Sequence, residues 1–176
     1  GDFSLCDSVS GVNFAIWNYT KWEPVSWLPG TIDGKINIMQ TDSYSGITLG
    51  GKFSYMGDAV NVIDYSYYGG FIKYSNSVAN EVNDIGEYNG ERYVVTTGDI
   101  DTTKLVLKLD YNGYWGAIYQ YPFTANKKQS VQTLCVRGDD LLVGGDIQYR
   151  SNLQPGPKGS NCGRIIQNQL ITYDGI

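Results

Sequence analysis

The side chains of this sequence that could do chemistry are carboxylates, tyrosines, lysines and three cysteines, because histidine is absent. Without an imidazole, the chain lacks the commonest general base, the usual metal ligand and any Ser-His-Asp or Cys-His arrangement of its own. Its acidic residues do not follow the spacing of a calcium-binding loop. Two carboxylates facing each other across a cleft could still hydrolyse a glycosidic bond. We predict no catalytic residue, no metal site and no cofactor; the alternative is a glycan-processing enzyme that uses carboxylates and tyrosine.

Charge and hydropathy narrow the range of partners. The formal net charge is −5 at pH 7, whereas binding to nucleic acid calls for clustered Lys and Arg. No stretch approaches the ~20 apolar residues that a membrane-spanning helix needs. We therefore expect no nucleic-acid partner and no membrane span within this segment.

A single N-x-[ST] sequon, Asn18-Tyr19-Thr20, is a candidate glycosylation site. Asn18 also falls at a predicted hairpin turn, where Asx residues are favoured because their side chains bond the local backbone. Both interpretations stay open. If the chain is extracellular, Asn18 should carry an N-linked glycan.

The elements that position these residues are predicted to be short β-strands. The chain has 22 Gly, 15 Tyr, 4 Trp and 5 Phe, and only 18% of its residues are charged. Aromatic residues suit half-buried, pleated surfaces, and glycine supplies turns with positive φ. No stretch of useful length has a helical period. This composition indicates an all-β chain.

The sequence repeats internally about every 48 residues. A glycine followed by a residue and then Phe or Ile recurs at intervals of 50, 47 and 47 residues, at Gly1, Gly51, Gly98 and Gly145. The repeat units are 1–50, 51–97, 98–144 and an incomplete 145–176. After a variable loop, each unit has an apolar run: Phe14–Trp17, Val62–Tyr65, Val106–Leu109 and Leu170–Tyr173.

Each complete unit is predicted to hold four strands joined by hairpins. An aromatic residue starts the strand after each turn, and tight turns such as Asn89-Gly90 are strong hairpin signals. The expected strands lie near 36–41, 46–53, 61–66, 70–75, 81–88, 91–100, 104–110, 114–121, 130–136, 140–148 and 168–174. Gly51, Gly98 and Gly145 should occupy equivalent positions.

Tandem antiparallel β-meanders of this kind predict part of a β-propeller. A four-stranded sheet with two apolar faces must stack on neighbours, and radial stacking is the propeller solution. A β-sandwich or barrel of about fourteen strands would explain the strands but not the repeat. About 3.5 units are fewer than the four to eight blades of a closed ring, so we expect a longer parent polypeptide.

The pattern resembles kelch-like propeller repeats, with a glycine doublet ending one strand, a Tyr in the next and a Trp after the following turn. It is more closely similar to the repeats of Rax-type fungal cortical marker proteins and related cell-surface propellers. The second unit departs from this pattern, because it lacks both the Asp and the Trp. The resemblance implies a secreted or cell-surface, non-enzymatic protein with an interaction or structural role. Its partners would be proteins, copies of itself through blade loops, or cell-wall or matrix glycans.

The three cysteines fit neither a CxxC motif nor a zinc site. Cys6 and Cys162 are disulfide candidates, both expected in the loop after the glycine element, three repeats apart. Loops three blades apart lie beyond the ~4.4–6.8 Å Cα separation of a disulfide, so we expect at least one to pair outside these 176 residues. Cys135 is predicted to be a buried free thiol in a strand.

The segment from Gln148 to Gln167 is predicted to be a long loop, and Gln154, Pro155, Pro157 and Lys158 within it are candidate interaction residues. Long loops on a repeat scaffold often carry binding specificity. A tolerated insertion without function is the other interpretation.

Overall fold

The computed structural model describes residues 5–6, 9–10, 13–24, 32–41, 46–66, 69–98, 104–120, 130–147, 160–166 and 169–172. Within these residues the chain forms strands and turns and no helix, as predicted. All eleven strands expected from the sequence are present, with ends that differ by a few residues. The fold is therefore all-β and antiparallel.

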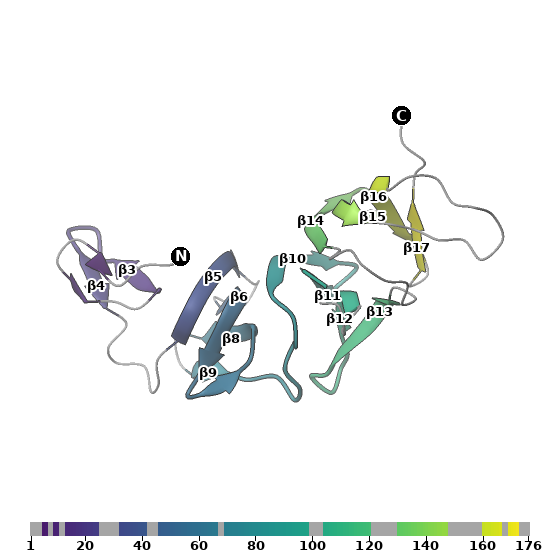
Figure 1. The fold of residues 1–176 in the computed structure, drawn as a ribbon. Coiled ribbons are helices and arrows are strands. Elements are labelled where there is room, and N and C mark those ends of the chain that lie inside the picture. The colour runs from purple at the N-terminus through teal and green to yellow at the C-terminus, as the bar shows by residue number, and fades with distance from the viewer. Residues whose placement is uncertain are drawn as a thin grey trace.

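Three antiparallel sheets follow one another along the chain, each with four main strands in sequence order, and the first sheet has a short fifth strand (Figure 1). The first sheet contains β5 (Ile32–Thr41), β6 (Gly46–Tyr55), β8 (Val62–Ser66) and β9 (Gly70–Ile72), and β7 (Asp58–Ala59) pairs with the end of β6. The second sheet contains β10 (Val82–Tyr88), β11 (Glu91–Thr96), β12 (Lys104–Leu109) and β13 (Trp115–Gln120). The third sheet contains β14 (Ser130–Arg137), β15 (Asp140–Ile147), β16 (Ser160–Ile166) and β17 (Gln169–Thr172).

Two short hairpins precede the first sheet. They are β1 (Leu5–Cys6) with β2 (Val9–Ser10), and β3 (Ala15–Trp17) with β4 (Trp22–Pro24). Phe14, just before β3, packs edge-on against Tyr65 and also contacts Phe71, with ring centroids 6.2 and 6.3 Å apart. The residue that leads into the β3–β4 hairpin, which we call the N-terminal hairpin, therefore packs on the first sheet.

The prediction for the region after Gly145 was wrong in one respect. Residues Ser160–Ile166 form strand β16, paired on both sides, and not the end of a long loop. The apolar run at Leu170 therefore lies in the fourth strand of the third sheet, not in the third strand. Cys162 accordingly lies in a strand, whereas the sequence placed it in a loop.

A β-bulge recurs at the same point in the first two strands of each sheet. The register shifts between Ile36 and Ile38, between Val82 and Asp84, and between Val131 and Thr133. The residues within the bulges are Asn37, Asn83 and Gln132. Bulges bend and twist a strand locally, so the three sheets share the same distortion.

The repeat glycines follow this register in two of three cases. Gly51 is paired with Ile36 and Gly145 with Val131, each the residue before a bulge. The equivalent partner of Val82 is Thr96, so Gly98 lies two residues further along. Gly51 and Gly145 are equivalent as predicted, and Gly98 is not.

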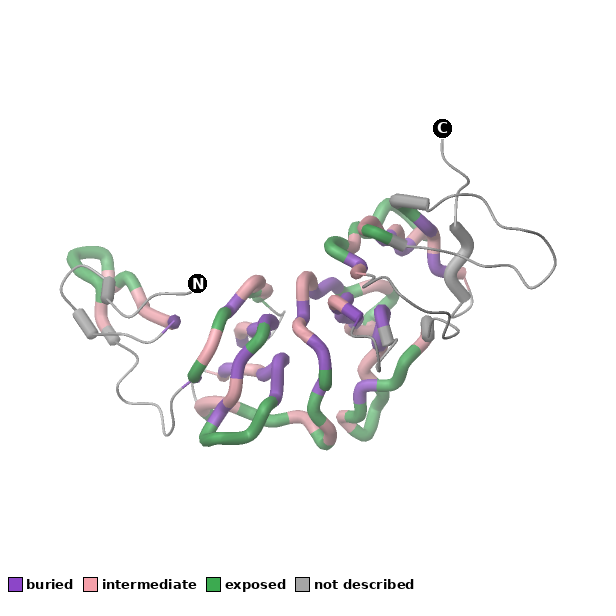
Figure 2. The backbone as a smooth tube through the Cα atoms, viewed as in Figure 1, coloured by how far each residue is buried: buried purple, intermediate pink, exposed green. Residues whose placement is uncertain are grey.

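Two apolar cores lie between successive sheets, where buried residues concentrate (Figure 2). The core between the first and second sheets includes Val62, Val82, Ile85, Val94, Leu107 and Trp115. The core between the second and third sheets includes Val95, Val106, Val131, Leu141, Val143 and Ile165. The first strands lie next to one another, β5 against β10 and β10 against β14.

The bulged asparagines connect each sheet to the next. The Asn37 side-chain amide donates hydrogen bonds to the carbonyl of Val82 at 2.9 Å and to the Glu81 carboxylate at 2.9 Å. The Asn83 amide donates to the carbonyl of Val131 at 2.7 Å. In both cases the acceptor is the residue before the next bulge, so one contact repeats between neighbouring sheets.

Candidate functional site

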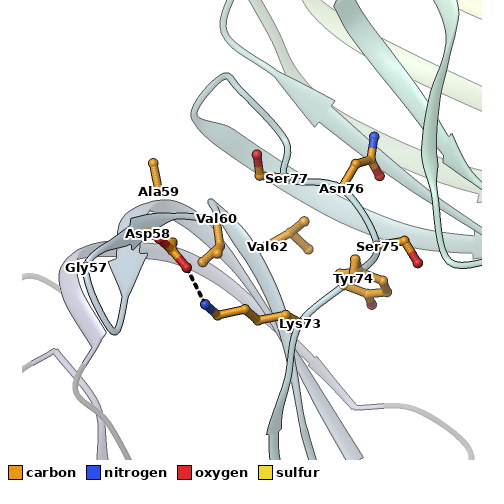
Figure 3. A pocket seen from close by; sticks show the side chains of 10 residues that line it. All are labelled: Gly57, Asp58, Ala59, Val60, Val62, Lys73, Tyr74, Ser75, Asn76 and Ser77. Atoms are coloured by element: carbon orange, nitrogen blue, oxygen red, sulfur yellow. Dashed lines mark hydrogen bonds and ion pairs between the residues drawn. The ribbon is translucent and has the colours of Figure 1, made fainter.

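The candidate binding site is an open groove of about 510 Å³ beside the connection from the first sheet to the second. We call it the 57–77 groove. One wall is the turn before and including β7, and the other is the connection after β9 (Figure 3). Its lining residues are Gly57, Asp58, Ala59, Val60, Val62, Lys73, Tyr74, Ser75, Asn76 and Ser77. The groove is therefore mostly polar, with apolar residues from the first sheet behind it.

An ion pair crosses the groove between its two walls. The Lys73 ammonium lies 2.6 Å from the Asp58 carboxylate (Figure 3) and 5.5 Å from the centre of the Tyr55 ring. The hydrogen bond and the charge of Lys73 lower the pKa of Asp58 below its usual range. Asp58 is therefore ionised at neutral pH, which suits an acceptor of hydrogen bonds and not a general acid.

Tyr74 fixes the connection to the sheets on both sides. Its hydroxyl accepts a hydrogen bond of 2.7 Å from Arg92 on β11, and Arg92 also bonds both carboxylate oxygens of Asp64 on β8 at 3.0 Å. Burial, followed by the charge of Asp64, raises the pKa of Tyr74 above its ordinary value. Tyr74 therefore stays protonated at neutral pH and serves as a fixed polar group.

The connection also holds the β12–β13 hairpin in place. The Ser75 backbone N–H donates to the carbonyl of Gly113, and the Ser75 hydroxyl donates to the carbonyl of Asn112, each at 2.9 Å. The Asn76 side chain bonds both the N–H and the carbonyl of Trp115, at 2.6 and 3.0 Å. These bonds place the hairpin tip beside the 57–77 groove.

The hairpin tip presents two exposed tyrosines. Tyr111 is 96% exposed and Tyr114 is 51% exposed. Asp110 shapes the turn, because its carboxylate accepts hydrogen bonds from the N–H groups of Asn112 and Tyr114 at 2.9 and 2.8 Å. A rigid turn with exposed aromatic rings thus lies next to a polar groove.

A similar turn, one residue shorter, closes the N-terminal hairpin, where Asn18 takes the place of Asp110. The Asn18 side-chain oxygen accepts from the N–H groups of Thr20 and Lys21 at 3.2 and 3.0 Å, and Tyr19 is 93% exposed. The Asn18 amide nitrogen donates to Glu23 at 2.6 Å. Asn18 thus has the turn role that the repeat predicted, and its glycosylation stays a prediction.

The groups at this surface are suited to hydrogen bonding and ion pairing. The groove holds hydroxyls, an amide and an ion pair, while the pKa shifts of Asp58 and Tyr74 move both groups away from neutrality. General acid–base catalysis works best with a pKa near the operating pH. Among the described residues, no group of three or more His, Cys, Asp or Glu side chains could hold a metal ion.

The remaining predicted residues are outside the described residues or belong to other strands. Gly1 and the loop residues Gln154, Pro155, Pro157 and Lys158 lie outside the described residues. Cys6 lies in β1, and the part of the chain that the structure describes contains no disulfide bond. Cys135 is a free cysteine, but it is exposed, so its predicted burial was wrong. The face of β14 that carries Cys135 points away from the second sheet.

The sequence did not predict the groove. Its residues lie in a turn and in a connection, and neither carries a recognisable motif. One signal was present, because Val60-Asn61 repeats Val12-Asn13, and both asparagines are buried with positive φ, 57° and 65°. The Asn61 amide donates to the Val78 carbonyl at 2.8 Å, which holds the connection against the first sheet.

No helix in the described residues is long and apolar enough to span a membrane. Comparison of the chain with protein-family models, with curated proteins and with solved structures gave no significant match.

Proposed function

We propose that this chain is a non-enzymatic binding scaffold, a segment of a secreted or cell-surface β-propeller that recognises another protein through the side formed by its hairpin tips. The observation that carries the proposal is the rigid β12–β13 tip, whose exposed Tyr111 and Tyr114 lie beside the 57–77 groove. Tyrosine is enriched in protein interfaces and among their hot spots, since it offers a large contact area and a polar end.

The propeller part of the proposal is supported by the way the sheets follow one another. Each sheet is a four-stranded meander, its first strand lies next to the first strands of its neighbours, and the same bulge contact joins successive sheets. Radially stacked meanders of this kind form propellers. A β-sandwich gives no reason for a contact that repeats in one direction.

A second candidate, glycan binding, is favoured by the composition of the groove. Hydroxyl and amide groups at Ser75, Ser77 and Asn76 line the groove, and Ser75 bonds the hairpin tip that carries the exposed Tyr111 and Tyr114. Sites for small ligands typically combine aromatic side chains with a few polar groups that fix the orientation of the ligand.

One set of variants separates these functions. A photo-crosslinking amino acid at position 111, with position 87 on β10 as the control, should capture a protein partner from the native source. The affinity of that purified partner should fall about tenfold or more in Tyr111→Ala and Tyr114→Ala. If a glycan array instead gives binding that these variants abolish, the glycan candidate is correct. Hydrolysis of a glycoside panel by the wild-type chain would contradict a non-enzymatic role.

The extracellular location is tested at Asn18. Intact-glycopeptide mass spectrometry of native material should show an N-linked glycan on Asn18. An unmodified Asn18 would count against passage through the secretory pathway.

A further inference from the structure

The two walls of the 57–77 groove carry opposite charges that keep spare hydrogen-bonding capacity. The Lys73 ammonium donates to one carboxylate oxygen of Asp58 at 2.6 Å, and the two side chains are 37% and 74% exposed (Figure 3). An ammonium has three hydrogens to donate and a carboxylate has two accepting oxygens. This ion pair uses one of each, so both groups can also bond a ligand in the groove.

The ion pair determines which ligands suit the groove. A cationic ligand would be repelled by Lys73, and an anionic ligand would be repelled by Asp58. A hydroxyl group suits both, because it can donate to the carboxylate and accept from the ammonium. The exposed hydroxyl of Ser77, which makes no hydrogen bond to the described residues, is a further group of this kind. A neutral ligand with several hydroxyls therefore matches the groove best.

The apolar residues of the groove suit the other part of such a ligand. Val60 and Val62, from the first sheet, line the groove and are 6% and 2% exposed. A sugar ring carries hydroxyls around its edge and C–H groups on its faces, so it can bond polar walls and contact apolar side chains together. The volume of about 510 Å³ is also within the range of small-ligand sites, ~300–1,000 Å³.

A buried hydrogen-bond donor lies in the layer of side chains next to the groove. Trp115 is 3% exposed, and its indole N–H has no acceptor among the described residues. Its ring packs edge-on against Tyr74, with ring centroids 5.1 Å apart, and shares a core cluster with Val62. Both neighbours line the groove. Because an unpaired buried donor costs free energy, a ligand oxygen on this side of the groove is favoured.

We propose that the 57–77 groove binds a neutral hexose unit of a glycan, with sugar hydroxyls bonded to Asp58, Lys73 and Ser77. The proposal rests on the glycan-binding candidate above and specifies its ligand, but it uses groove residues and not the hairpin tyrosines. Asn76 bonds both backbone groups of Trp115, so a ligand that moves the groove wall also changes the surroundings of the indole.

The indole N–H of Trp115 reports binding directly. The chain has 4 Trp, so a ¹⁵N-labelled sample has few indole signals, and the Trp115 signal is the one missing in Trp115→Phe. Addition of glucose, mannose or galactose should shift this signal, with a dissociation constant on the order of 1–10 mM for the best of the three. Glucuronate and glucosamine, which carry a charge, should bind at least about fivefold more weakly than that hexose.

Two groove variants and one control show where the sugar binds. Lys73→Met and Asp58→Asn should each weaken hexose binding about fivefold or more. Lys52→Met, which removes an exposed lysine of β6 outside the groove, should bind like the wild type.

Three results would overturn the proposal. They are a Trp115 signal that no hexose shifts up to about 100 mM, binding of glucuronate or glucosamine at least as tight as that of the best hexose, and unchanged hexose binding in Lys73→Met. If one of these occurs while the captured protein partner still depends on Tyr111, the protein-binding function stands. If glycans on an array still bind and Tyr111→Ala abolishes that binding, the glycan-binding candidate stands and only the groove site is wrong.

Discussion

At the scale of single residues, buried Asn61 and half-buried Asn76 join backbone segments that strand pairing does not connect. Asn61 has a positive φ of 57°, a conformation that asparagine tolerates better than most residues. Its side-chain oxygen accepts from the Phe53 N–H at 3.0 Å, and its amide donates to Val78 at 2.8 Å. Asn76 similarly bonds both backbone groups of Trp115. Because buried polar groups must be paired, these amides fix the connection that lines the 57–77 groove.

The stability of the chain should depend on pH through Glu91. Its carboxylate bonds the Lys108 ammonium at 2.6 Å and the Tyr93 hydroxyl at 2.9 Å, and these partners lower its pKa. A carboxyl whose pKa is lower in the folded chain stabilises it above the unfolded value of about 4.3. That contribution is lost as the pH falls below this value, through the folded pKa.

The expected measurement is a smaller loss of unfolding free energy between about pH 5 and pH 2 in Glu91→Gln than in the wild type. The effect should be small, because the pair is exposed and water screens it. Glu87→Gln on β10 is the matched control. An acid-side slope unchanged in Glu91→Gln would contradict the assigned pKa shift.

At the scale of strands, the bulge explains why glycine recurs. A Cβ on Gly51 would lie 2.1 Å from the carbonyl oxygen of Lys35, and one on Gly145 would lie 2.2 Å from that of Ser130. Both contacts are with backbone of the paired strand, which cannot move aside without disturbing the ladder. Gly145 also has a φ of +156°.

Gly51→Ala and Gly145→Ala should therefore each destabilise the chain, by about 1–3 kcal/mol. Gly116→Ala on β13 is the control, because its added Cβ would meet nothing closer than 3.9 Å, and its effect should stay within about 0.5 kcal/mol. Chemical denaturation of the three variants measures this. Equal losses at all three glycines would mean that the bulge does not require glycine.

The sequence predicted the strands well where apolar residues alternate and turns carry Gly or Asn. It failed at β16, where Asn161-Cys162-Gly163-Arg164 has no apolar alternation, and pairing with β15 and β17 makes the strand. It misplaced Gly98, because the position that Gly51 and Gly145 occupy opposite the residue before the bulge is held by Thr96 in the second sheet, two residues earlier. It assigned burial to Cys135 from strand alternation alone, although the face of β14 that carries Cys135 is uncovered.

The site was less predictable than the fold. The position of Asn18 at a turn followed from the repeat and its equivalence to Asp110. The groove could not be predicted from the repeat, because it depends on where the connection of residues 73–77 lies relative to β7 and to the β12–β13 tip. Those hydrogen bonds link residues nearly 40 positions apart through backbone carbonyls. Every residue type has a backbone carbonyl, so the type of the accepting residue does not reveal such a bond.

At the scale of the whole molecule, the central claim is that successive sheets are equivalent units joined by one repeated contact. This contact gives the order of the sheets a direction, because each asparagine donates to the sheet that follows its own. Repeat proteins of this kind derive their stability from nearest-neighbour interfaces.

The free energy of unfolding of Asn37→Ala, Asn83→Ala and Gln132→Ala tests this claim most directly, measured at concentrations where the chain is monomeric. Asn37→Ala and Asn83→Ala should each lose about 1–3 kcal/mol, because each leaves the carbonyl of the next sheet without its amide donor. Gln132→Ala should lose less than about 0.5 kcal/mol, since Gln132 is exposed and its amide bonds the Ser130 hydroxyl of its own strand. Similar losses at all three positions, or no loss at Asn37 and Asn83, would contradict the repeated contact between sheets.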